Sequence, residues 1–353
     1  MEIIFSKLFK IDITAKIAEE RPDLHKIANF KVYIQNMLEQ ISEKNPDRFY
    51  NFRSEHTEVR NLINSILFDN EFDNSSLAIA NRLLVKECVA QEDLEKKKLT
   101  QRITKGMLIV SLIRMTSEAS KLVILKVDYD EFISDLTGEI ATGLSIRRKV
   151  YKALICELDN ENNILTTAIY DTNTSSSTYW WDKFLELDVI RQNNINTKNA
   201  FDAIHGEILK PLKTNYKQDY LHLWNITLGY FKLGGEFNLD FYVNEILGNY
   251  TPYNNKVSMG ELMTKCAKLP EKLAEKNKFD RKFTKDKATL KGKKYHETIK
   301  ISNEIDLVLN DHVANLADII TAKYDPETNE KFLILRSDLG YEYAKSLKKD
   351  VDE

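Results

Sequence analysis

Two nearly unbroken apolar runs, GMLIVSLIRM (106–115) and KLVILKVDYD (121–130), constrain the fold more than any other feature of the sequence. A strand made of such a run needs cover on both faces, so both are expected to be central strands of a sheet. Residues 147–158 and 163–173 form two further strand-like runs, and the turn signal DNEN (159–162) between them predicts a hairpin. The four runs together predict one mostly antiparallel sheet.

Amphipathic helices precede this sheet in the sequence. Apolar residues in 23–41 recur at three- and four-residue spacing, and those of EVRNLINSIL (58–67) do the same. We therefore expect an α+β domain over residues 1–190, in which these helices pack on the sheet. Apolar stripes with helical spacing return after it and predict a helical segment over 191–277. A basic segment and a small C-terminal β region are expected in 278–353.

The cysteines and the N-terminus indicate the compartment. Cys88, Cys156 and Cys266 are far apart in the sequence, and none belongs to a CxxC pair. We interpret them as small buried side chains in a reducing environment. The N-terminus lacks the basic and then apolar pattern of a signal peptide, and no apolar run approaches the roughly 20 residues that cross a bilayer. The sequence therefore predicts a cytoplasmic protein with no membrane partner.

Sequence patterns of known catalytic centres are absent. We find no phosphate-binding loop, no dinucleotide-binding glycine fingerprint and no nucleophile elbow, and we interpret His205, beside an apolar stripe, as structural. The one ExK pattern near an aspartate, in DLEKKK (93–98), has no strand character, so a metal-dependent nuclease is the less favoured alternative. Asp128, Asp130 and Glu157 could chelate a metal, but solvated strand ends are the simpler interpretation. We expect a protein that is not an enzyme and uses no metal or cofactor.

Charge is distributed unevenly along the chain. The whole sequence has a formal net charge of −3, yet residues 265–300 hold 13 basic and 5 acidic side chains, a local net charge of +8. Within 281–294 there are seven cations and one anion, Asp286, whereas an ordinary solvated surface mixes both signs. Such sorting of charge indicates a polyanionic partner.

Two interpretations of residues 276–300, called the basic window below, stay open. It could be a solvated amphipathic segment that Phe279 and Phe283 anchor to the core, or it could be a DNA-binding surface. Clustered lysines neutralise several backbone phosphates at once, and lysine meets phosphate as a point charge without identifying bases. The second interpretation predicts duplex DNA binding with little sequence preference, by Lys278, Arg281, Lys282, Lys285, Lys287, Lys291, Lys293 and Lys294.

A second, smaller cluster of cations leads into the strand at 147–158. Arg147, Arg148 and Lys149 follow one another directly, and Lys152 lies close behind them. These side chains could add contacts to DNA. A patch of charge at the end of a strand explains them equally well.

The order of several segments is similar to that of a known protein family. The segments are SSLAIANRLL (75–84), ITKGMLIV (103–110), KLVILKVDYDEF (121–132), RRKVYKALIC (147–156), YWWDKFLELDVIRQNNINTKN (179–199), FDRKFTKDKATLKGKK (279–294) and the closing strands from IKISNEIDLVL (299–309) to FLILRSD (332–338). Over about residues 55–340 they resemble the bacterial nucleoid-associated protein family of the NdpA type. The resemblance implies a protein that associates with the nucleoid by binding double-stranded DNA, without a known catalytic centre.

Two departures from that family leave an alternative open. The segment CVAQEDLEKKKLTQR (88–102) is longer than the family usually has, and the first fifty residues match poorly. A specialised relative fits these departures, for instance a DNA-binding or DNA-sensing subunit of an anti-phage defence or DNA-processing complex. In that case the acidic N-terminal domain could contact a protein partner. Either protein could also form homo-oligomers.

Overall fold

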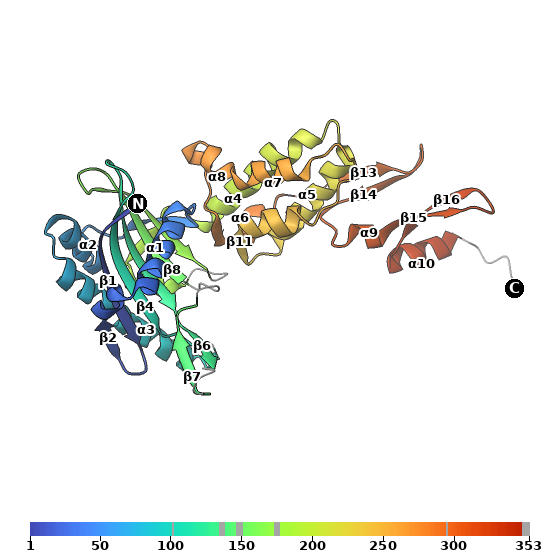
Figure 1. The fold of residues 1–353 in the computed structure, drawn as a ribbon. Coiled ribbons are helices and arrows are strands. Elements are labelled where there is room, and N and C mark those ends of the chain that lie inside the picture. Colours follow the sequence, from blue (N-terminus) through green and yellow to red (C-terminus); the bar gives the residue numbers. More distant parts are fainter. Residues whose placement is uncertain (101, 134–137, 146–150, 173–176, 294–295, 348–353) are drawn as a thin grey trace. The chain divides into compact units, whose positions relative to one another are not determined.

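The structure is a computed structural model that describes residues 1–100, 102–133, 138–145, 151–172, 177–293 and 296–347 (Figure 1). Contacts between residues divide the chain into two compact units. Unit 1 comprises residues 1–200, 235–240 and 268–285, and unit 2 comprises residues 201–234, 241–267 and the chain from 286 onward. Residues 268–285, the first part of the basic window included, therefore belong to unit 1.

Unit 1 is built around an eight-stranded sheet in the order β10–β3–β9–β8–β5–β4–β1–β2 (Figure 1). Every neighbouring pair of strands is antiparallel. The strands are β1 (Glu2–Asp12), β2 (Ile17–Glu20), β3 (Arg48–Phe52), β4 (Gly106–Arg114), β5 (Ser120–Asp128), β8 (Tyr151–Leu158), β9 (Ile164–Asp171) and β10 (Leu187–Val189). The four predicted runs correspond to β4, β5, β8 and β9, so the predicted antiparallel sheet is confirmed.

Helices cover both faces of this sheet. They are α1 (Ala28–Glu43), α2 (Glu58–Phe68) and α3 (Phe72–Lys96). Val123 and Leu125 of β5 share one apolar cluster with α1, whereas Leu122 and Ile124 share the other with α2 and α3. Successive side chains of a strand point to opposite faces, so a strand between two helical layers is apolar at every position. This cover explains why the apolar runs are unbroken.

Short elements complete unit 1. β6 (Asp130–Ile133) and β7 (Ile140–Gly143) form a separate hairpin, and β11 (Glu236–Asn238) pairs with β12 (Lys282–Thr284) in an antiparallel sheet of two strands. The short helix α8 (Leu269–Lys272) also belongs to this unit. The helix α4 (Asn193–Ala203) begins in unit 1 and ends in unit 2.

Unit 2 is helical in its first part and contains two-stranded sheets in its last part. Its helices are α5 (Lys217–Lys232), α6 (Leu239–Phe241, begun in unit 1), α7 (Met259–Ala267), α9 (Leu316–Ile319) and α10 (Asp338–Leu347), and its strands are β13 (Glu297–Lys300), β14 (Asp306–Leu309), β15 (Ile320–Asp325) and β16 (Glu330–Leu335). The protein is therefore α+β, with a large N-terminal antiparallel sheet and a small C-terminal β region, as predicted. None of the described helices has the length and apolar character needed to cross a membrane.

Candidate nucleic-acid interface

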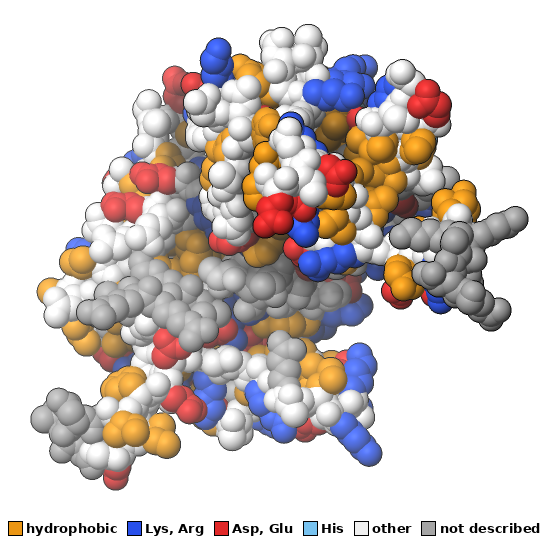
Figure 2. Space-filling model, turned by 90° about the vertical axis from the view of Figure 1, so that its right-hand side faces the viewer, with side chains coloured by type: hydrophobic (Ala, Val, Ile, Leu, Met, Phe, Trp, Pro, Cys, Tyr) orange, Lys and Arg blue, Asp and Glu red, His pale blue; other side chains and the backbone are white. Residues whose placement is uncertain are grey.

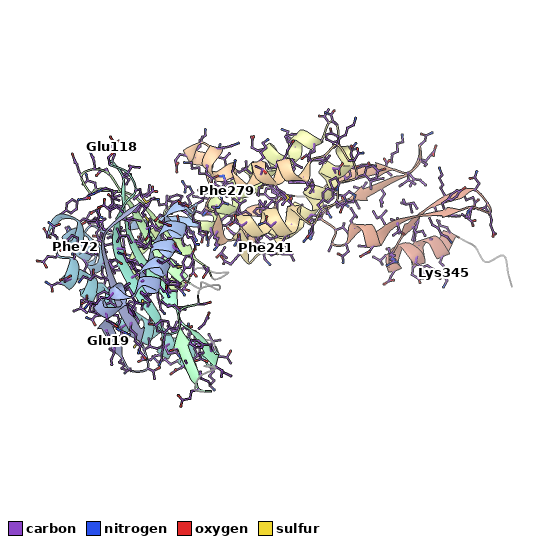
Figure 3. All side chains as sticks on the ribbon, viewed as in Figure 1. Glu19, Phe72, Glu118, Phe241, Phe279 and Lys345 are labelled. Atoms are coloured by element: carbon purple, nitrogen blue, oxygen red, sulfur yellow. The ribbon has the colours of Figure 1, made fainter. Side chains whose placement is uncertain are left out.

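The first part of the basic window is fixed to unit 1 by two phenylalanines. Phe283 lies on β12 opposite Phe237 of β11, and their rings stack with centroids 4.6 Å apart. Phe279 meets the same Phe237 ring edge-on at 6.1 Å. All three side chains are buried (Figure 3 labels Phe279). The anchoring by Phe279 and Phe283 that the first interpretation of the window predicts is present.

Three of the predicted DNA-binding cations of unit 1 are largely buried. The Arg281 side chain is 12% exposed and contacts Asp240 at 2.7 Å and Glu271 at 3.0 Å. The Lys282 side chain is 11% exposed and contacts Asp47 at 3.0 Å. Its ammonium group also donates to the backbone oxygen of Asp171 at 2.7 Å. Lys285 is buried as well. The expectation that these side chains are solvated is wrong, because distant carboxylates hold Arg281 and Lys282 against unit 1.

Lys278 belongs to a neighbouring network of mixed charge. Its ammonium group lies 2.9 Å from Glu275, whose carboxylate also contacts Arg191. Arg191 in turn lies 3.2 Å from the buried Asp280, and Arg48 lies 3.5 Å from the same carboxylate. Burial raises the pKa of Asp280 although both guanidinium groups lower it. Apart from the pair of Lys278 with Glu275, these contacts join residues far apart in the sequence, so no local pattern predicts them.

A pocket of about 600 Å³ lies beside this network in unit 1. Arg60, Arg191 and Lys278 line it together with Glu55 and Glu275. The cations of the pocket thus have carboxylates among them: Arg60 lies 3.1 Å from Glu55, and Arg191 and Lys278 both contact Glu275. A polyanion would compete with these carboxylates for the same cations, so the pocket does not favour DNA.

The second part of the window, in unit 2, presents its lysines differently. Asp286, the one anion within 281–294, caps a short helical turn (Lys287–Leu290) because its carboxylate accepts a hydrogen bond from the Ala288 N–H at 2.9 Å. Leu290 anchors this turn because its side chain is buried. Lys287 and Lys291 are both exposed at either end of the turn. Both lysines therefore present side-chain surface to solvent, and the end of the Lys287 side chain lies next to Gly234.

A row of four rings lies next to Lys293 in unit 2. The rings follow one another as Tyr220, His205, Trp224 and Phe201, with centroid separations of 6.2, 4.1 and 5.3 Å. Lys293 is paired with Asp202 at 2.9 Å, and its ammonium group lies 5.6 Å from the Phe201 ring centroid. At the other end of the row, the Lys213 ammonium group lies 5.7 Å from the Tyr220 ring centroid. A lysine thus stands at each end of the row.

The electrostatics of His205 show that cations from separate segments converge there. Burial lowers the pKa of His205, and the charges of Lys293, Lys210 and Lys213 lower it further against the opposing charge of Asp202. Lys210 and Lys213 are exposed and were not among the predicted residues. The signal that could have found them is LKPLKTNYK (209–217), where lysines recur without an acid. The ring of His205 packs on Trp224, and its Nε2 lies 3.2 Å from the Tyr220 hydroxyl, contacts of the kind that a structural role requires.

Arg147, Arg148, Lys149 and Lys294 lie outside the described residues. Lys152, beside the first three in sequence, is buried, with its ammonium group 4.0 Å from Asp128.

Two of the three acids named as alternative metal ligands, Asp128 and Glu157, are engaged with lysines. Asp128 also lies 3.3 Å from Lys126, and Glu157 lies 3.1 Å from Lys121. Burial raises the pKa of Glu157, but hydrogen bonds from Thr166 and Lys121 outweigh it and lower the pKa overall. Within the described ranges, no group of three or more His, Cys, Asp or Glu side chains could hold a metal ion.

No protein-family model, no curated protein and no solved structure matches this chain. The similarity to the nucleoid-associated family therefore stays a hypothesis based on the segments quoted above. The chemistry of the surface has to be argued from its own side chains.

Proposed function

We propose that the protein is a non-catalytic DNA-binding protein, associated with the bacterial nucleoid, that holds the duplex backbone with little sequence preference. The observation that carries this proposal is the placement of Lys213 and Lys293 at the two ends of one row of rings, where the charge of Lys210 also acts on His205. Lysines from distant parts of a sequence that gather at one place raise the local positive potential. Such a place attracts closely spaced phosphates and releases their counterions.

The side-chain chemistry also supports binding without sequence preference. Arginine is the residue that pairs bidentately with guanine, and Arg281 is the one arginine among the predicted residues of the basic window. Two carboxylates, those of Asp240 and Glu271, already occupy its guanidinium group. The exposed cations of unit 2 in this region are lysines, which neutralise phosphate charge but do not identify bases.

Binding of purified protein to two unrelated DNA duplexes, measured at several salt concentrations, tests the proposal. The parent protein should bind both duplexes with similar affinity, and log K should fall linearly with log[salt]. The double variant Lys210→Ala/Lys213→Ala and the double variant Lys287→Ala/Lys291→Ala should each weaken binding to both duplexes alike. Each phosphate contact that a variant loses should flatten the slope by roughly 0.9.

A matched control is the double variant Lys323→Ala/Lys345→Ala, which removes two exposed lysines from β15 and α10. It should keep the slope of the parent. No measurable binding by the parent at low salt would overturn the proposal. A loss confined to one of the two sequences would also overturn it, because a base contact costs about 1–3 kcal/mol on its own sequence only.

A further inference from the structure

The C-terminal strand β16 exposes a continuous apolar run. Phe332, Leu333, Ile334 and Leu335 are consecutive, and their exposed fractions lie between 40% and 46%. Consecutive residues of a strand point to opposite faces, so both faces of β16 are apolar and uncovered. Figure 2 shows hydrophobic side chains at the surface on the face that it presents. The central strands of unit 1 have the same kind of run and are covered on both sides. Among the described residues, β16 therefore lacks the cover that those central strands have on both faces.

The hairpin leaves one edge of β16 open to a further strand. Among the described residues, β16 pairs with β15 alone, in a sheet of two strands. An isolated two-stranded hairpin is marginally stable, and three or more strands with a covered face are needed for independent stability. An open apolar edge offers its N–H and C=O groups to a further strand.

The hydrogen bonds of the hairpin fix which residues face the open edge. The Arg336 N–H donates to the Ile319 carbonyl at 2.9 Å, in line with the register that pairs Ile334 with Thr321 and Phe332 with Lys323. Hydrogen-bonded pairs alternate along an antiparallel ladder. The backbone groups of the odd-numbered residues, 331, 333 and 335, therefore point away from β15.

We propose that two copies of this chain associate by pairing β16 with β16 of the second copy, antiparallel and centred on Leu333. In this register Leu333 lies opposite its own counterpart, Phe332 lies opposite Ile334, and Glu330 lies opposite Arg336. Several registers place outward-facing odd-numbered residues opposite one another, and this one also places Glu330 opposite Arg336. The two-fold axis of the dimer produces the same pair at the other end of the interface. Lys331 lies opposite Leu335 in this register and has no acidic partner there. The apolar residues and the Glu330–Arg336 pairs are self-complementary, which suits the same patch on both partners.

The other edge of the hairpin is less suited to such pairing. β15 has the sequence ITAKYD, with the exposed Lys323 near its middle, whereas the lysine of β16, Lys331, lies next to the first residue of the strand. An edge lysine discourages strand addition, and more so within the paired stretch than at its end. The neighbouring helix α10 presents Leu339, Tyr343 and Leu347 at four-residue spacing, and all three are more than two-thirds exposed. These side chains can cover a four-stranded sheet formed by two hairpins. This dimer is independent of DNA binding, so either proposal can fail alone.

The mass of the full-length protein in solution, measured by sedimentation at micromolar concentrations, tests the dimer. The parent should have twice the 41.0 kDa of one chain. Glu330→Arg alone and Arg336→Glu alone place like charges opposite each other at both ends of the interface. Each should weaken dimerisation by roughly tenfold. The double variant Glu330→Arg/Arg336→Glu restores opposite charges and should recover the parent's dimerisation.

Disulfide formation tests the register directly. Leu333→Cys places two thiols opposite each other with Cα atoms about 5.5 Å apart, which suits a disulfide. Leu335→Cys is the matched control, since the exposed fractions of the two leucines are 46% and 45% and both point to the same face. Its two copies would lie about 13 Å apart along the strands. Oxidation should cross-link the first variant and not the second or the parent. A monomeric parent, dimerisation indifferent to the charge changes, or equal cross-linking of both cysteines would overturn the proposal.

Discussion

At the scale of single residues, Arg281 and Lys282 are neighbours with similar exposure, yet their partners differ. The Asp47 carboxylate beside Lys282 is 4% exposed, whereas the Asp240 carboxylate beside Arg281 is 54% exposed. An exposed carboxylate that loses its partner is hydrated by water. A buried one is left as an uncompensated charge, which is far more costly.

This difference predicts unequal effects on stability. Lys282→Ala should lower the free energy of unfolding by about 3 kcal/mol, because it leaves Asp47 buried without its cation. Arg281→Ala should lower it by no more than about 1 kcal/mol, because its partners stay in contact with water. Urea denaturation of the two variants and the parent measures both values. Equal losses would show that burial of the partner does not govern the effect.

At the scale of secondary-structure elements, the sequence predicted what depends on local pattern. The runs that became β4, β5, β8 and β9 were recognisable because cover on both faces makes most of their positions apolar. The two-stranded sheet of β11 and β12 was not recognisable. Its strands have three residues each and come from segments more than forty residues apart, and one of them interrupts the predicted helical segment.

The candidate surface was predictable to a similar extent. The excess of lysine pointed to residues 276–300, but the state of each lysine depends on a partner elsewhere in the sequence. Lys282 is held by Asp47, 235 residues away, and Lys293 by Asp202, 91 residues away. Long-range ion pairs of this kind leave no mark in the local sequence. The charge pattern therefore named Lys287 and Lys291, which are exposed, together with cations that long-range ion pairs hold.

The β11–β12 sheet leads to a prediction of its own. Phe283→Ala should lower the free energy of unfolding by about 3–5 kcal/mol, because it leaves a cavity beside Phe237 and Phe279. Phe283→Leu should cost clearly less, since it keeps most of the buried volume. Thermal or urea unfolding compares the two variants. If the free energy of unfolding of the alanine variant falls by less than about 1 kcal/mol, the β11–β12 sheet does not anchor the basic window.

At the scale of the whole molecule, the basic window serves two purposes. Its first part fixes β12 to unit 1 through ion pairs and buried rings. Its second part presents Lys287 and Lys291 to solvent in unit 2, which also carries the exposed Lys210 and Lys213. If two copies associate through β16, each dimer carries two such surfaces. Two linked surfaces on one DNA molecule bind more tightly than one, because the second contact becomes intramolecular.

The reactivity of individual lysines, with and without bound DNA, tests the central claim most directly. Mass spectrometry after brief acetylation reports how far DNA shields each ammonium group. We expect protection of Lys210, Lys213, Lys287 and Lys291 by any duplex sequence, lost at high salt, and unchanged reactivity of Lys345 on α10 (labelled in Figure 3). Unchanged reactivity of the four lysines while DNA is bound would contradict the account.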